Sequence, residues 1–128
     1  MAINKTLFIF IMMLFSSGIA VGQQKNQIVR IAKIQVDSVQ LESYKAALKE
    51  EIETSLRIES GVLTLYAVSE KKHPSHITIF ETYADTAAYQ SHLQTPHFKK
   101  YKDIVKNMVT SLELVEVDPI VVRSKTGK

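Results

Sequence analysis

The chain has 128 residues, a formal net charge of +3 and no cysteine. This length fits one domain, and the absence of cysteine excludes disulfides, thiolate metal sites and thiol nucleophiles. The small net charge argues against a nucleic-acid-binding protein, because the one basic cluster is typical of a solvated helix face. That cluster consists of Lys99, Lys100, Lys102 and Lys106.

Residues 1–22 have the pattern of a secretory signal peptide. Lys5 supplies a positive start, residues 7–15 form an uninterrupted apolar run, and residues 20–22 (AVG) offer small side chains for cleavage. The apolar run is shorter than the roughly 18 to 20 residues that span a membrane. We therefore expect a secreted or periplasmic protein with no stable membrane insertion after cleavage. A retained N-terminal anchor is the alternative.

A short linker, residues 23–27, precedes the expected domain, residues 28–122. Branched residues at 28–36 predict a first strand. Asp37 and Gln40 have capping-box spacing, and a helix is expected from about 39 to 59. Gly61 is expected to end this helix in the left-handed conformation. The apolar stripe of the helix is Leu41, Tyr44, Leu48, Ile52 and Leu56.

Residues 62–69 and 76–83 predict two strands joined into a hairpin by a polar loop. Alternation along the second of them places Glu81 and Tyr83 on the same face as two isoleucines. After the hairpin, Asp85 is expected to cap a short helix over 86–93, on which Tyr89 and His92 share a face with a leucine.

Thr95 and Pro96 then predict the start of a third helix, which is expected to run to about residue 109. A last strand is predicted over 112–117, with a short extension at 120–122. The polar residues 123–128 are expected to be a disordered tail.

This order, β-α-β-β-α-β with the second helix split at Pro96, predicts an α+β ferredoxin-like fold. Four antiparallel strands would carry the helices on one face and leave the other face open. Because apolar strand residues would lie on the open face, we expect a homodimer formed through it.

Between about residue 28 and residue 117 the chain contains an ordered set of motifs: Glu59-x-Gly61, Tyr66, Pro74, Glu81-x-Tyr83, His92 and Thr95-Pro96-His97-Phe98. This set resembles the antibiotic biosynthesis monooxygenase (ABM) family. The resemblance implies a dimeric α+β barrel that oxidises a small aromatic or quinol-like substrate with O2 and without a flavin, haem or metal cofactor. Other relatives degrade haem or isomerise small carbonyl compounds, and the absence of Trp argues against the haem-degrading branch.

His92 and Glu81 are the predicted catalytic residues. A histidine with an ordinary pKa of about 6.5 can take a phenolic proton near neutral pH. Glu81 lies mid-strand, where burial would raise the pKa of its carboxyl group. The structural alternatives are a His92 that holds the split helix through backbone hydrogen bonds, and a Glu81 tied to the backbone or to a partner chain.

The predicted substrate-binding residues are Tyr66, Tyr83, Tyr89, His97 and Phe98, which would form a wall around a planar substrate. Ordinary core packing of the aromatic residues, and an exposed or capping His97, are the alternatives. Glu59 is expected to form a compensating hydrogen bond at a helix C-terminus. No metal site is predicted, because the His73–His76 and His92–His97 pairs lack a third ligand at a recognised spacing.

The leading hypothesis is therefore a cofactor-independent monooxygenase whose partners are a small aromatic substrate, O2 and a second copy of the chain. A non-catalytic ligand-binding or stress-response dimer, and a small-carbonyl isomerase on the same fold, are the alternatives.

Overall fold

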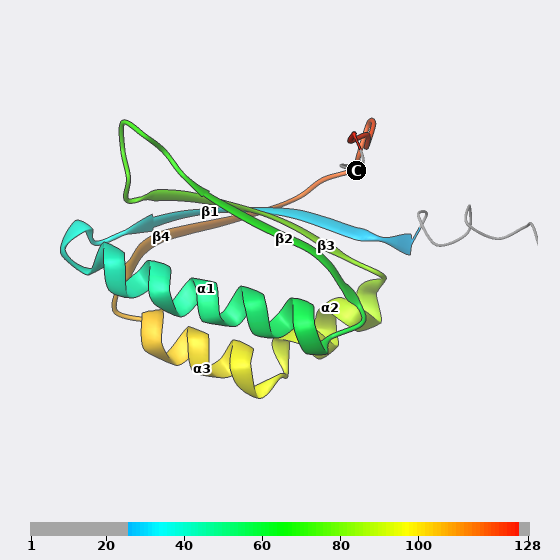
Figure 1. Cartoon of the computed structure of the whole chain (residues 1–128), viewed down its shortest axis with the longest axis horizontal. Helices are drawn as coiled ribbons and strands as arrows, with labels where there is room; N and C mark the ends of the chain where they lie inside the picture. Colours follow the sequence, from blue (N-terminus) through cyan, green and yellow to red (C-terminus); the bar gives the residue numbers. More distant parts are fainter. Residues whose placement is uncertain (1–25, 126–128) are drawn as a thin grey trace, which may run out of the picture.

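The computed structural model describes residues 26–125 (Figure 1). The predicted signal peptide therefore lies outside the described residues, as do the last three positions of the predicted tail. None of the described helices is long and apolar enough to cross a membrane. The elements are β1 (Ile28–Val36), α1 (Leu41–Ile58), β2 (Val62–Ser69), β3 (His76–Tyr83), α2 (Thr86–Leu93), α3 (Pro96–Val105) and β4 (Val109–Glu116).

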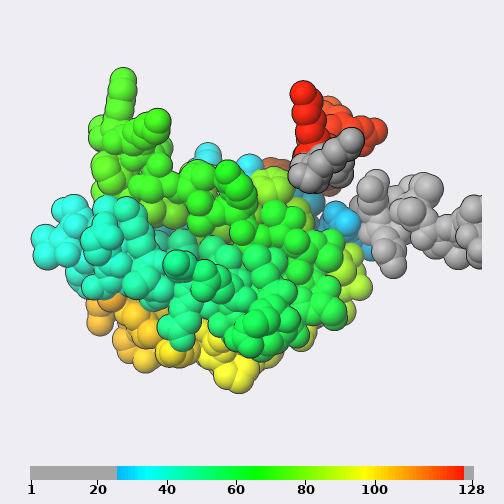
Figure 2. All heavy atoms as spheres, viewed as in Figure 1, coloured from blue at the N-terminus to red at the C-terminus, as the bar shows by residue number. Residues whose placement is uncertain are grey.

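The four strands form one antiparallel sheet in the order β2-β3-β1-β4. All three helices lie on the same side of this sheet (Figure 1). The β2–β3 hairpin is formed as predicted, and its tip projects from the body of the molecule (Figure 2). The α+β ferredoxin-like fold, with the second helix split in two, is confirmed.

The core lies between the sheet and helices α1 and α3. Ala32 and Ile34 of β1 and Ile77 and Ile79 of β3 form its floor. Tyr44, Leu48, Tyr101 and Val105 close it from the helices, and the hydroxyl groups of the two tyrosines share a hydrogen bond of 2.8 Å. The predicted apolar stripe of α1 is buried only in part, since the side chain of Leu56 is 44% exposed.

Side-chain caps fix the two short helices. Asp85 accepts a hydrogen bond of 2.7 Å from the backbone of Ala88, and Thr95 caps α3 with Pro96 at its first position.

The start of α1 differs from the prediction. Asp37 caps a single 3-10 turn that precedes the helix, and the Gln40 side chain bonds to the Asp37 side chain rather than to its backbone.

The prediction of a left-handed Gly61 was wrong, because no glycine among residues 26–125 has a positive φ. Gly61 serves close packing instead. A Cβ built on it would lie 2.5 Å from the Cβ of Ala88, so α2 can approach the end of α1 only because position 61 has no side chain.

The C-terminal part of the fold also differs from the predicted boundaries. Helix α3 ends at Val105, and β4 begins at Val109 rather than at residue 112. The backbone of Met108 accepts a hydrogen bond of 2.8 Å from Asp37, and Val109 pairs with Val36, so pairing with β1 begins directly after the helix. The predicted strand extension at 120–122 does not form.

Candidate functional site

A network of histidines and carboxylates joins the ends of the three helices. One oxygen of Glu59, Oε2, lies 2.9 Å from Nδ1 of His92 and 2.7 Å from Nε2 of His97. Glu59 follows the last turn of α1, His92 lies in the last turn of α2 and His97 lies in the first turn of α3. The break at Pro96 therefore turns both imidazoles towards the same carboxylate. The predicted hydrogen bond to Glu59 is present.

The charge on Glu59 is stabilised by these contacts. Burial by itself raises the pKa of Glu59, but the hydrogen bonds from His92 and His97 outweigh it and hold the pKa below its ordinary value. Because the carboxylate is ionised at neutral pH, the ring nitrogen of each histidine that faces it carries a hydrogen. His92 is only 2% exposed, so its ring is fixed inside the protein.

Glu51 is a buried member of the network that the sequence prediction did not include. Its Oε1 lies 3.5 Å from Nε2 of His92 and accepts a hydrogen bond of 2.7 Å from Ser55. Burial raises the pKa of Glu51, against the opposing effects of Ser55 and His92. The i,i+4 spacing of Glu51, Ser55 and Glu59 beside the apolar stripe was the available signal.

This network includes three groups that could hold a metal ion. Each group offers one donor atom, and the three atoms lie within 4.8 Å of one another. The groups belong to Glu51, His92 and His97. The sequence suggested no third ligand for the His92–His97 pair, because Glu51 comes from a distant helix. Two imidazoles and a carboxylate suit Zn²⁺. The hydrogen bonds to Glu59 already satisfy one nitrogen of each ring without a metal.

Aromatic rings surround His92. The ring centroids of Tyr83 and Phe98 lie 5.4 Å and 4.9 Å from that of His92, and the ring of Tyr89 lies 5.1 Å from that of Tyr83. Four of the predicted site residues are therefore brought together, from β3, α2 and α3. Tyr83 is fully buried.

Glu81 extends this cluster along β3. Its Oε1 accepts a hydrogen bond of 2.8 Å from the hydroxyl of Tyr83. Burial raises the pKa of Glu81, and the Tyr83 hydrogen bond and the charge of His92 offset this only in part. A carboxylate with a raised pKa is a stronger proton acceptor than an ordinary glutamate.

Arg30 is a second residue that the prediction did not include. It lies directly opposite Glu81 in the β1–β3 pairing. Its Nη1 donates a hydrogen bond of 2.8 Å to the hydroxyl of Tyr89, and its guanidinium carbon lies 4.1 Å from the centre of that ring. The strand pattern showed only that Arg30 interrupts an apolar run.

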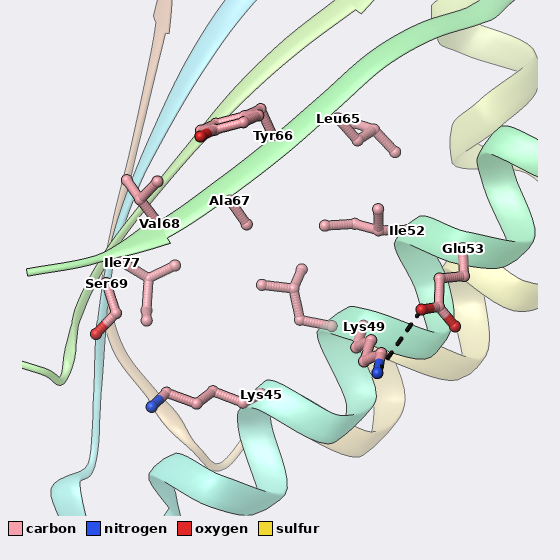
Figure 3. A pocket seen from close by; sticks show the side chains of 11 residues that line it. Lys45, Lys49, Ile52, Glu53, Leu65, Tyr66, Ala67, Val68, Ser69 and Ile77 are labelled. Atoms are coloured by element: carbon pink, nitrogen blue, oxygen red, sulfur yellow. Dashed lines mark ion pairs between the residues drawn. The ribbon is translucent and has the colours of Figure 1, made fainter.

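Tyr66 lies apart from the other predicted site residues. It pairs with Phe80, on the sheet face that the helices leave open, and is 67% exposed. Its ring points away from α1, whereas Ala67 points towards the helix (Figure 3). The hollow shown there, of about 390 Å³ between α1 and β2, contains neither His92 nor Glu81.

Two further hollows flank the histidine network. A cavity of about 20 Å³ is lined by Glu51, His97 and Tyr101. On another side, a hollow of about 580 Å³ is lined by Glu59, Gly61 and Ser91. His92 lines neither hollow, and a ligand in the larger one would meet Glu59 first.

Comparison with known proteins now identifies the family. The family model for antibiotic biosynthesis monooxygenases matches residues 27–104. The chain belongs to the antibiotic biosynthesis monooxygenase family. The resemblance predicted from the sequence is therefore confirmed. A comparison with curated proteins finds no match.

Similar solved structures agree with this assignment. A proposed antibiotic biosynthesis monooxygenase from Bacteroides thetaiotaomicron is 53% identical, has a TM-score of 0.78, and matches over 81% of this chain and 99% of its own. A proposed monooxygenase from Lactobacillus acidophilus is 26% identical, with a TM-score of 0.69 and coverage of 73% of this chain and 50% of that chain. A 16% identical protein from Caulobacter crescentus has a TM-score of 0.70, with coverage of 75% and 92%, and shows the shared fold alone.

Proposed function

We propose that this ABM-family protein is a monooxygenase that oxidises a small aromatic or quinol-like substrate with O2 and without a bound cofactor. The observation that carries the proposal is the contact between Glu81 and Tyr83. It places a half-buried carboxylate, with a raised pKa, beside the aromatic rings of Tyr83 and Tyr89. Family membership supports the reaction class. The position of Glu81 beside the tyrosine rings supports its role as the base.

Glu81 takes the substrate proton in this proposal. An anthrone illustrates the balance, because its ring methylene lies next to aromatic rings that are conjugated with a carbonyl and is therefore acidic. Loss of one proton to Glu81 leaves an anion, which passes one electron to O2. The resulting radicals combine to form a carbon–oxygen bond, giving a peroxide.

Protonated Glu81 gives its proton to the peroxide anion, and the regenerated carboxylate takes the remaining carbon-bound proton as the oxygen–oxygen bond breaks. Glu81 then returns this second proton to the departing hydroxide. In sum, the methylene group and one molecule of O2 become a carbonyl group and one molecule of water, and the substrate supplies all the electrons. The protein supplies a base, an aromatic surface and stabilisation of the anion.

His92 acts as a positioning residue in this scheme. Its buried ring packs beside Tyr83, and its charge favours the ionised form of Glu81. Glu59 holds the ring orientation through Nδ1, as carboxylates commonly do for catalytic histidines. Removal of His92 would disturb both the Tyr83 ring and the proton affinity of Glu81.

We also propose that the protein is exported and works as a homodimer. The N-terminal sequence pattern supports secretion or transfer to the periplasm. The open sheet face supports dimerisation, because Tyr66, Val68 and Phe80 are exposed there. A second copy covering these side chains would remove that apolar surface from water.

The test is oxygen uptake by the purified chain with 1,8-dihydroxy-9-anthrone, corrected for autoxidation of the substrate. We expect Glu81→Gln to lower the catalysed rate by about a hundredfold or more and His92→Gln by about tenfold. Glu113→Gln and His73→Gln are controls for exposed residues and should stay within about twofold of the parent rate. Uptake by the parent chain that equals autoxidation would reject the proposal.

A non-catalytic ligand-binding module is the second candidate. It is favoured by one observation, the complete burial of His92 with its polar contacts directed to Glu59 and Glu51. The same experiment separates the two functions when binding is measured alongside. An aromatic ligand that binds without catalysed oxygen uptake would establish the module.

A further inference from the structure

Arg30 contains the one buried side-chain polar atom, within residues 26–125, that has no hydrogen-bond partner. That atom is Nε, whereas Nη1 donates to the hydroxyl of Tyr89. Leaving a buried donor unpaired is unfavourable, and more so for a charged group. A guanidinium is a permanent cation in proteins, so this is an unpaired donor on a positive charge.

The charge of Arg30 also lacks a close counter-ion. The strand pairing places Glu81 on one side of Arg30 and Glu116 on the other. In the described part of the chain, no ion pair joins either carboxylate to the guanidinium within 4.0 Å. The groups that face Arg30 are therefore two carboxylates beyond contact distance and the Tyr89 ring from α2.

An apolar surface lies beside Arg30 on the same side of the sheet. Leu114 pairs with Ala32, and Leu112 pairs with Ile34, so both leucines share the face that carries Arg30 and the helices. They are 50% and 46% exposed, because β4 is the edge strand. An aromatic ring can rest on these leucines while a polar substituent reaches towards β1.

We propose that Arg30 is the anion-binding residue of the substrate site, and that it recognises the ionised hydroxyl or enolate oxygen of a planar aromatic ligand lying on Leu112 and Leu114. This inference rests on the proposed function and deepens it. Arg30 would hold the negative oxygen, and Glu81, opposite Arg30 in the β1–β3 pairing, would take the proton.

A redox-stable ligand tests this inference apart from oxygen chemistry. The probe is 2-hydroxyanthraquinone, whose visible spectrum changes when its hydroxyl group ionises, titrated into the purified chain at several pH values. We expect the bound probe to ionise at a pH about one unit or more below that of the free probe. Arg30→Met should abolish this shift and weaken binding of the ionised probe by about tenfold or more.

Three controls separate charge recognition from misfolding. Anthraquinone, which has no hydroxyl group, should bind the parent chain and Arg30→Met alike. Arg30→Lys should keep part of the shift because it keeps the charge. Lys102→Met removes an exposed cation from α3, away from the open sheet face, and should change nothing. The inference is overturned if 2-hydroxyanthraquinone does not bind, or binds without a shift, even where oxygen uptake is observed.

Discussion

Oε2 of Glu59 lies 2.9 Å from Nδ1 of His92, although the two residues are 33 positions apart in the chain. The contact joins the end of α1 to the end of α2, and His97 adds a second hydrogen bond to the same oxygen. Glu59 therefore connects all three helices at the end of the molecule where the family motifs gather.

The first prediction concerns Glu59→Gln. The pKa of Glu59 is lowered in the folded protein, so its stabilising contribution is present above the ordinary value of 4.5 and is lost as the pH falls through the folded value. At neutral pH the free energy of unfolding of the variant should be about 1 to 3 kcal/mol lower than that of the parent.

Urea unfolding between about pH 3 and pH 7 measures this difference, which should shrink below the ordinary pKa of 4.5 as the parent loses its charge. Glu53→Gln is the matched control, because Glu53 is an exposed residue of the same helix with a weak 3.9 Å contact to Lys49. A difference that stays constant across this range would contradict the prediction.

The second prediction concerns the stability of Glu81→Gln. The pKa of Glu81 is raised in the folded protein, so the parent is most stable below the ordinary value of 4.5 and loses stability as the pH rises through the folded value. Glutamine does not ionise, so the variant should gain stability relative to the parent as the pH rises from about 4 to 8.

Thermal unfolding across this pH range checks the prediction, with Glu113→Gln as the control on the exposed face of β4. A variant that becomes less stable than the parent with rising pH would show that the ionised carboxylate is a net stabilising group. Glu81→Gln is also expected to be inactive, so the substitution would raise stability and remove function.

The third prediction concerns the contact between α1 and α2. Gly61→Ala adds a methyl group 2.5 Å from the Cβ of Ala88 and should destabilise the protein by about 1 to 3 kcal/mol through overpacking. Adding Ala88→Gly makes room for this methyl group. The double variant should therefore be more stable than the sum of the two single changes predicts.

Chemical unfolding of the parent, both single variants and the double variant gives the coupling between the two positions. Ala87→Gly is the helix-propensity control, because it removes a methyl group from the same helix at an exposed position. Simple additivity would mean that the two side chains do not meet in solution.

The fourth prediction concerns assembly. If the open sheet face forms a homodimer, Phe80→Glu should place a charge within the interface and halve the molar mass in solution. Light scattering coupled to size exclusion measures this mass. Leu56→Glu changes a residue of similar exposure on α1, away from that face, and should leave the mass unchanged. A parent chain that is already monomeric would rule out this interface.

Sequence reasoning identified the elements because each has a local cause. Branched residues and alternation predicted β1, β2 and β3, and Asp85, Thr95 and Pro96 predicted both starts of the split helix. It failed at Gly61 and at the start of β4. In both places a contact with a neighbouring element determines the backbone conformation. At Gly61 this is the close approach of Ala88 on α2, and before β4 it is the hydrogen bond from Asp37 to Met108.

The candidate site follows the same division. The sequence by itself determined that His92, Tyr83, Tyr89 and Phe98 belong together, because motif spacing and helix periodicity place them on facing elements. Only the tertiary structure decided that Glu51 joins His92, that Arg30 lies opposite Glu81, and that Tyr66 lies on the other sheet face. The physical reason is that strand register and helix packing set these contacts between residues far apart in the chain, whereas local periodicity fixes only the face on which each residue lies.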